Sequence, residues 1–141
     1  MSADVVVSLH CDRDEGGRAQ GVASHYWGGR DALSASPTGH RLADLVQREV
    51  VARTGLVDCR AHPRTWELLQ VTSMPAVWVE LGYLSHDGDA GRLATPAFRD
   101  TLAEGLLAAV QRLFLPEQQD WSTGSLHLDD VLAMVDASTR R

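Results

Sequence analysis

The chain has 141 residues, of which 44% are hydrophobic, a size and composition that support one compact domain but not two. Thirteen basic residues, all of them arginine, stand against nineteen acidic ones, so the net charge is -6 and nucleic acid is excluded as a partner. The longest early apolar run is only Val5 to Leu9 and has no basic leader, so we expect neither a signal peptide nor a membrane span in this sequence.

The first half of the chain predicts two strands and a helix. A strand is expected over 4–9, a polar and glycine-rich loop over 12–20 and a second strand over 21–27. A helix is expected over 38–53, because apolar residues recur there at the helical period of 3.6, and Thr54-Gly55 should end it.

The second half predicts a third strand and two further helices. A short packed segment is expected at 66–69, a strand at 76–79 and a loop over 82–91. Pro96 and Pro116 bracket a long helix with one apolar stripe. After a linker, apolar residues at helical spacing indicate an amphipathic tail helix; they are Leu128, Val131, Leu132 and Val135.

Two of the predicted strands each end on a residue that can do chemistry. The first runs into His10, and the strand at 76–79 runs into Glu80. Short runs rich in β-branched residues are typical of buried strands in a parallel sheet, where ligand sites gather beyond the carboxyl ends, so His10 and Glu80 are expected to share one rim. A histidine there can equally be a hydrogen-bonded rim residue, whereas an unpaired buried carboxylate is costly.

The sequence motifs around these residues resemble those of the zinc-dependent N-acetylmuramoyl-L-alanine amidases of the Amidase_3 family. The resemblance runs from Ala3 to about Pro116 and rests on Ser8-Leu9-His10 and on the longer motif Val79-Glu80-Leu81-Gly82-Tyr83-Leu84-Ser85. It implies an α/β fold with a mostly parallel sheet flanked by helices. It also implies that His10 is a ligand of Zn²⁺ and Glu80 the catalytic base. The segments 45–55, 58–60 and 65–69 resemble the actinobacterial CwlM-type branch of the family. Residues 58–60 also align loosely with a short turn of the family, so the resemblance implies a turn there.

The resemblance also implies an incomplete metal site. In the family, two further zinc ligands, a His in a Gly-His-Gly-Gly loop and a Glu, lie on a βαβα segment upstream of the Ser-x-His motif. This sequence contains neither Gly-His-Gly nor His-Glu-x-x-His. Catalytic zinc usually has three protein ligands. We therefore expect residues 1–116 to be the C-terminal portion of an amidase-like catalytic domain without the family's first strands, and 117–141 to be a linker and amphipathic tail.

Three other residues depart from the family pattern or align with it loosely. Asp12 replaces an asparagine. It is a candidate substrate-binding residue, and it can also be a partner of His10, an oxygen ligand or a solvated carboxylate. His86 replaces another asparagine and either approaches the metal or lies in a surface loop. Arg60 belongs to a basic patch with His62 and Arg64, which either binds carboxylates of a stem peptide or is solvated surface.

Two functions remain open at this stage. The first is zinc-dependent hydrolysis of the amide between N-acetylmuramic acid and L-alanine, with a muramoyl peptide or peptidoglycan stem peptide as substrate. The second is an inactive amidase-like regulator of peptidoglycan synthesis that acts through protein partners, with the 117–141 tail as a docking element. The sequence as written predicts a cytoplasmic location, and an export signal upstream would instead direct it to the cell wall or periplasmic space.

Overall fold

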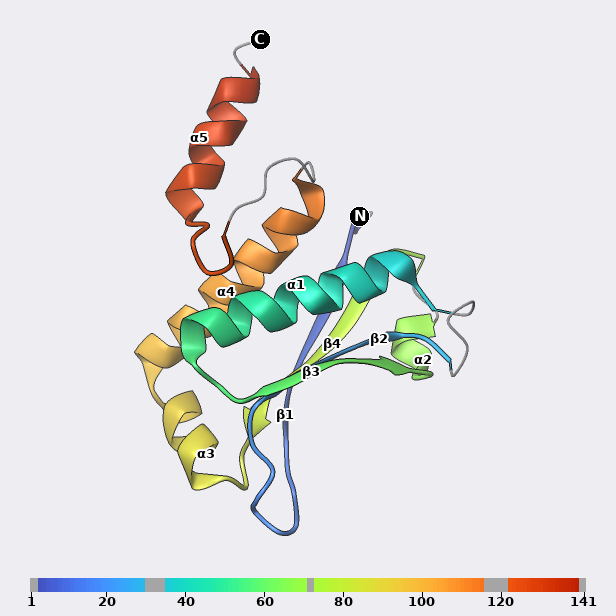
Figure 1. Ribbon diagram of the computed structural model, residues 1–141, viewed down its shortest axis with the longest axis vertical. Coiled ribbons are helices and arrows are strands. Elements are labelled where there is room, and N and C mark those ends of the chain that lie inside the picture. The colour runs from blue at the N-terminus through green and yellow to red at the C-terminus, as the bar shows by residue number, and fades with distance from the viewer. Residues whose placement is uncertain (1–2, 30–34, 71–72, 116–121, 140–141) are drawn as a thin grey trace.

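A computed structural model describes residues 3–29, 35–70, 73–115 and 122–139 (Figure 1). None of the helices in these ranges is long and apolar enough to cross a membrane. The elements in chain order are β1 (Val6–Asp12), β2 (Val22–Trp27), α1 (Pro37–Thr54), β3 (Asp58–Arg64), α2 (Glu67–Gln70), β4 (Ala76–Tyr83), α3 (Asp87–Ala94), α4 (Pro96–Phe114) and α5 (Leu128–Thr139).

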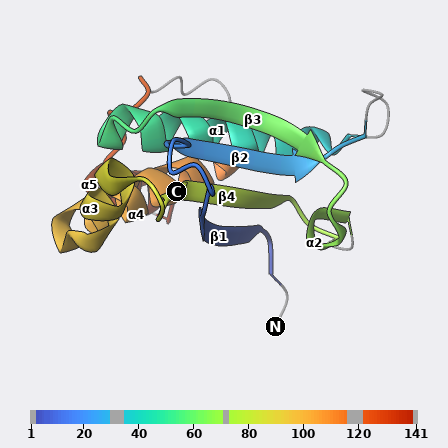
Figure 2. The ribbon, with the colours of Figure 1, turned by 90° about the horizontal axis from the view of Figure 1, so that it is seen from below.

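The four strands form one sheet in the order β1-β4-β2-β3, which can be followed in Figure 2. β1 pairs with β4 and β2 pairs with β3, both in parallel, while β2 and β4 run antiparallel to each other. The sheet is therefore mixed, with two of its three pairings parallel as expected. One consequence is that β1 and β4 end at one side of the sheet, whereas β2 and β3 end at the opposite side.

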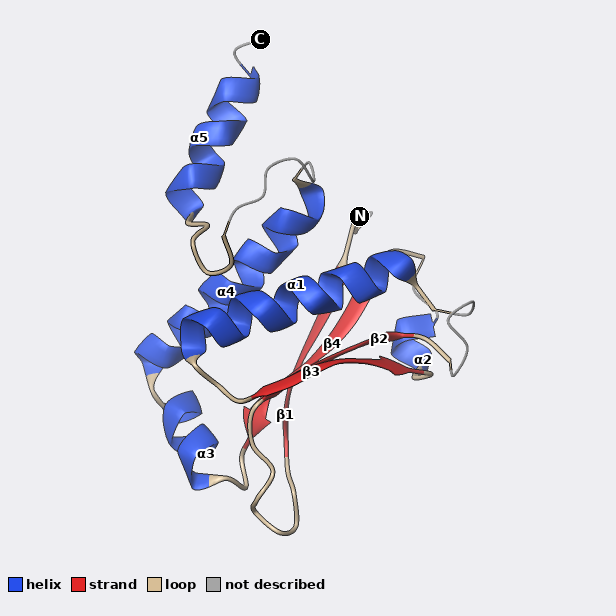
Figure 3. Cartoon of the chain, in the orientation of Figure 1, coloured by secondary structure: helices blue, strands red, loops and turns tan. Residues whose placement is uncertain are grey.

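One face of the sheet carries the hydrophobic core. Helices α1 and α4 lie on this face, behind the strands in Figure 2, and α1 crosses in front of β1 and β4 in Figure 3. Val77 and Val79 of β4 are fully buried there against Leu42 and Val46 of α1. Because side chains alternate along a strand, Trp78 and Glu80 must point to the other face.

Helix α1 confirms the sequence prediction to within a residue at each end. Ser36 caps its first turn by accepting a hydrogen bond from the Gly39 N–H, and Pro37 follows at the first helical position. Gly55 ends the helix with a φ of 63°, a left-handed conformation that glycine adopts without strain. The predicted helix from Pro96 is also present, as α4.

Two elements were predicted wrongly. The turn expected at 58–60 is the start of strand β3, a polar edge strand whose residues lack apolar alternation and which contains Pro63. The loop expected over 82–91 gives way to helix α3 at Asp87. Gly88 and Gly91 lower the helix propensity of that segment, but a side-chain cap and two first-turn aspartates favour it.

A buried charge cluster joins α1, α4 and the segment that precedes α5. Glu49 of α1 is fully buried and forms ion pairs with Arg53 and with Arg112 of α4. Its carboxylate also accepts a hydrogen bond from the Gly124 N–H at 3.1 Å. A buried carboxylate is tolerable only with such partners, so this cluster fixes how the three segments pack.

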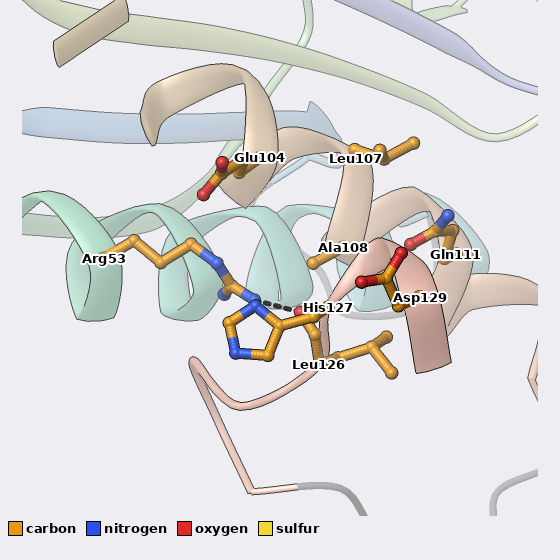
Figure 4. A pocket seen from close by; sticks show the side chains of 8 residues that line it. All are labelled: Arg53, Glu104, Leu107, Ala108, Gln111, Leu126, His127 and Asp129. Atoms are coloured by element: carbon orange, nitrogen blue, oxygen red, sulfur yellow. Dashed lines mark hydrogen bonds between the residues drawn. The ribbon is translucent and has the colours of Figure 1, made fainter. Parts of the chain in front are cut away.

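The same arginines hold the segment 122–127 through its backbone. Arg53 donates a hydrogen bond to the Leu126 carbonyl, marked in Figure 4, and Arg112 donates one to the Ser122 carbonyl. The Leu126 side chain is buried between the helices. The start of the tail is thus packed on α1 and α4, while the boundary predicted at 116 lies outside the described residues.

We expect Glu49→Gln to lower the free energy of unfolding by about 3–5 kcal/mol, because it leaves two buried guanidinium groups without their shared counter-charge. Urea denaturation followed by circular dichroism measures the change. The matched control is Asp44→Asn on the same helix, which removes an exposed ion pair with His40 and should cost no more than about 0.5 kcal/mol. Equal effects for the two variants would contradict the structural role of the cluster.

Candidate functional site

The register of β1 against β4 brings the two predicted site residues together. His10 is the direct Cα partner of Glu80, and Ser8 is the partner of Trp78. All four residues have side chains on the face of the sheet opposite α1 and α4. The shared location predicted for His10 and Glu80 is therefore confirmed, although the two lie within their strands rather than beyond the strand ends.

Glu80 is a buried carboxylate with one defined partner. Its relative exposure is 9%, and its Oε1 accepts a hydrogen bond from the Trp78 indole Nε1–H at 2.5 Å. This bond holds the carboxylate on the sheet face and leaves the second oxygen without a protein donor among the bonds of the described residues. A carboxylate held in this way can accept a proton from a water molecule.

His10 is held by two contacts. Its Nε2 is hydrogen-bonded to Ser8 Oγ at 2.6 Å. Its ring stacks on Trp78 with 3.3 Å between ring centroids and 2° between planes. The imidazole is therefore oriented by both a polar and an aromatic neighbour.

An aromatic strip continues from Trp78 across the sheet. Trp66, just before α2, lies edge-on to Trp78 at 5.1 Å and to His25 of β2 at 4.9 Å. His25 in turn lies 5.8 Å from His62 of β3. The strip thus connects the middle of the sheet to its β3 edge.

His25 is buried and its Nδ1 has no hydrogen-bond partner. Burial lowers its pKa to about 4, and the nearby positive charge of Arg64 adds to the effect. The imidazole is therefore neutral at neutral pH. His25 was not predicted as a site residue, because it lies inside a largely apolar strand.

The two residues expected to bind substrate lie at the margins of this face. Asp12 ends β1, is exposed and accepts a hydrogen bond from the Arg13 N–H at 2.7 Å. Arg60 is exposed on β3, with a φ of 69° and its N–H bonded to Asp58 Oδ1 at 2.9 Å. No side-chain contact of either with His10 or Glu80 is present, so their substrate roles stay predictions.

His86 and Asp89 order the chain that follows Glu80. The His86 side chain caps α3 by accepting a hydrogen bond from the Asp89 N–H. The buried Asp89 carboxylate accepts hydrogen bonds from Gly21 N at 2.8 Å and Tyr83 N at 3.1 Å. His86 is thus a helix cap, and Asp89 ties the start of β2 to the end of β4.

The donors on this face do not complete a metal site. Nowhere in the described part of the chain do three or more His, Cys, Asp or Glu side chains gather in a way that could hold a metal ion. His10 and Glu80 alone fall short of the three protein ligands usual for catalytic zinc. The Zn²⁺ expected from the family therefore has one candidate ligand here, His10.

Sequence reasoning missed the aromatic residues of the site. Trp78 is two residues before Glu80, so strand alternation alone places both on one face, and this signal was present in the sequence. Trp66 and His25 carry no such signal. Their approach depends on the antiparallel pairing of β2 with β4, in which His25 is the partner of Trp78.

The chain is therefore an α/β domain in which a histidine and a glutamate are paired in the middle of one sheet face. Residues 1–112 match the Amidase_3 family of N-acetylmuramoyl-L-alanine amidases, and the chain belongs to that family. It is 47% identical over 133 residues to the N-acetylmuramoyl-L-alanine amidase CwlM of Mycobacterium tuberculosis. That match covers 94% of this chain and 32% of the relative.

Solved structures share the fold. An N-acetylmuramoyl-L-alanine amidase from Clostridium difficile 630 superposes with a TM-score of 0.71 at 28% identity, over 78% of this chain and 57% of that one. The CwlD amidase from Clostridioides difficile, solved with the GerS lipoprotein, gives a TM-score of 0.70 at 21% identity over 79% and 54%. The chain thus spans about a third of the curated relative and just over half of these structures.

We expect the stability of the fold to fall as the pH drops from about 6.5 to 4, because of His25. The folded pKa lies near 4 and an unfolded histidine titrates near 6.5, so the unfolded chain takes up the proton first. The full stabilisation is present above about pH 6.5, and up to about 3 kcal/mol is lost once the pH is below 4.

Urea denaturation at several pH values, on wild type and His25→Gln, isolates this effect. The variant should show a shallower decline between pH 6.5 and 4, whereas His40→Gln on the surface of α1 should follow the wild type. Parallel curves for wild type and His25→Gln would show that His25 is not the group responsible.

Proposed function

We propose that this chain acts as a peptidoglycan amidase that cuts the amide between N-acetylmuramic acid and L-alanine. The observation that carries the proposal is the in-register pair His10 and Glu80 on one face of an Amidase_3 fold. Similarity to CwlM and to the Clostridium difficile amidase supports the same reaction class. The substrate is then a muramoyl peptide or the stem peptide of peptidoglycan.

Glu80 is the proposed general base. Its free oxygen takes a proton from a water molecule whose oxygen attacks the amide carbonyl carbon. The carbon–nitrogen bond then breaks, and the proton passes from Glu80 to the leaving amine of L-alanine. The products are the lactyl carboxylic acid and a peptide with a free amino terminus. The Trp78 indole keeps the carboxylate aimed while the proton moves.

The proposal includes zinc dependence, and His10 is the one zinc ligand that it assigns. The family resemblance makes His10 a ligand, and its ring is already oriented by Ser8 and Trp78. Since the described donors number fewer than three, no step of the reaction is assigned to the metal.

A second candidate function is favoured by that same shortage of donors. Without a metal site, the domain serves as an inactive amidase-like regulator of peptidoglycan synthesis that binds protein partners. The solved complex of CwlD with a lipoprotein supports the idea that this fold can carry a protein partner. Leu132 of α5 and Phe114 of α4 are large exposed apolar side chains available for such contacts.

Hydrolysis of a muramoyl peptide, followed by the release of free amino groups, tests the first function. We expect activity in the wild type and a loss of at least about 100-fold in Glu80→Gln, which keeps the shape of the side chain but cannot accept the proton. His10→Ala should lose both activity and any zinc retained after dialysis. Phe114→Ala, which changes an exposed side chain at the end of α4, should retain both.

An inactive wild type would favour the second function. An inactive wild type without bound zinc, still folded by circular dichroism, would contradict the amidase proposal and direct attention to protein partners.

A further inference from the structure

A cationic and aromatic corner lies where β3 ends and α2 begins, at one edge of the sheet in Figure 2. The guanidinium carbon of Arg64 lies 5.7 Å from the centre of the Trp66 ring. Within the described residues, the only hydrogen bond of the Arg64 side chain goes to the neighbouring Pro63 carbonyl, at 3.1 Å. No carboxylate of those residues forms an ion pair with it.

Arg64 brings a positive charge to this edge of the sheet although the whole chain carries a net charge of -6. His25 and His62, partners across β2 and β3, lie on the same face, and the positive charge of Arg64 contributes to the lowered pKa of His25. His62 donates from Nε2 to the Cys59 carbonyl at 2.6 Å and is therefore held in place. A positive corner in an acidic protein is complementary to an acidic ligand.

Aromatic contacts connect this corner to Glu80. Trp66 lies 5.1 Å from Trp78, and the Trp78 indole donates to the Glu80 carboxylate. Trp66 is 38% exposed, so its ring presents surface to a ligand. The two indoles therefore form a continuous floor between Arg64 and the proposed catalytic base.

The strand pairing sets the length of that floor. Arg64 is the Cα partner of Trp27, and Glu80 is the partner of Ala23, four residues earlier in β2. Four residues of strand and two strand spacings separate the Cα atoms of Arg64 and Glu80 by roughly 16 Å. Allowing for the reach of the arginine, a bound carboxylate would lie about three to five extended residues from Glu80.

We propose that Arg64 binds a carboxylate of the stem peptide, with Trp66 and Trp78 as the floor on which the peptide lies. Arg64 is then a specificity-determining residue that selects acidic over amidated stem peptides. This inference rests on the proposed function, because the scissile amide is assumed to lie at Glu80. The planar guanidinium suits the role, since it can hold a carboxylate through two parallel hydrogen bonds.

The test compares two probes, an N-acetylmuramoyl tripeptide with a free C-terminal carboxylate and the same molecule with a C-terminal carboxamide. Isothermal titration calorimetry on the full chain measures the affinity for each. We expect the wild type to bind the carboxylate form about 10-fold more tightly than the carboxamide form. In Arg64→Gln this preference should fall to no more than about 2-fold.

Two further variants make the test specific. Arg92→Gln on α3 removes the same charge from a different part of the molecule, so it should keep the wild-type preference. Arg64→Lys keeps the charge but loses the planar fork, so it should show an intermediate preference, and it replaces Arg64→Gln if that variant does not fold.

A wild type with no preference, or an Arg64→Gln variant that keeps one of 5-fold or more, would overturn the inference. If that occurs while the muramoyl peptide is still cleaved in a Glu80-dependent way, the proposed function stands without this subsite. If the preference is present and depends on Arg64 but no cleavage occurs, the subsite stands and the amidase proposal fails. If neither probe binds, both fail.

Discussion

The parallel pairing of β1 with β4 is the constraint on which the rest of the structure depends. It places His10 directly opposite Glu80. Because side chains alternate along a strand, a slip of one residue would turn His10 toward the helices and bring Leu9 to the site. The buried valines of β4 oppose such a slip, since they must face α1 and α4. Core packing on one face therefore sets the chemistry of the other.

The two faces of the sheet differ in how far their buried polar groups are paired. On the helix side, the inward residues of β4 are aliphatic, their burial stabilises the fold, and the buried Ser24 of β2 is hydrogen-bonded to Gln47 of α1. On the other side, Glu80 and His25 are buried polar groups. Trp78 satisfies Glu80, but the Nδ1 of His25 has no partner. Incompletely satisfied groups of this kind are expected where a surface is shaped for a ligand rather than for stability.

The sequence predicted those elements whose pattern is local. The apolar period of α1 and its Gly55 end, the strand before Glu80 and the helix begun by Pro96 all follow from residues close together in the chain. Strand β3 was missed because it is a polar edge strand, and edges need no apolar alternation. Helix α3 was missed because its two glycines indicated a loop, although its first turn is capped by a side chain.

The candidate site was predictable to the extent that it depends on β1 and β4. The sequence placed His10 and Glu80 together because both follow parallel-type strands, and Trp78 follows from the same alternation. The contributions of Trp66, His25 and Arg64 were not predictable, because they require β2 to run antiparallel to β4 and β3 to lie beside β2. Long-range pairing is the information that one sequence, read alone, does not contain.

The catalytic and the regulatory functions make different demands on this one face. Binding an acidic peptide needs only the Arg64 charge and the indole floor, and both are already in place in the folded chain. Hydrolysis in addition needs a carboxylate free to move a proton, and Glu80 has one oxygen bound to Trp78 and the other available. A domain with too few metal donors can therefore keep peptide recognition without catalysis. The proposed Arg64 subsite therefore belongs to substrate binding, whereas the exposed apolar side chains of α4 and α5 are the surface proposed for protein partners.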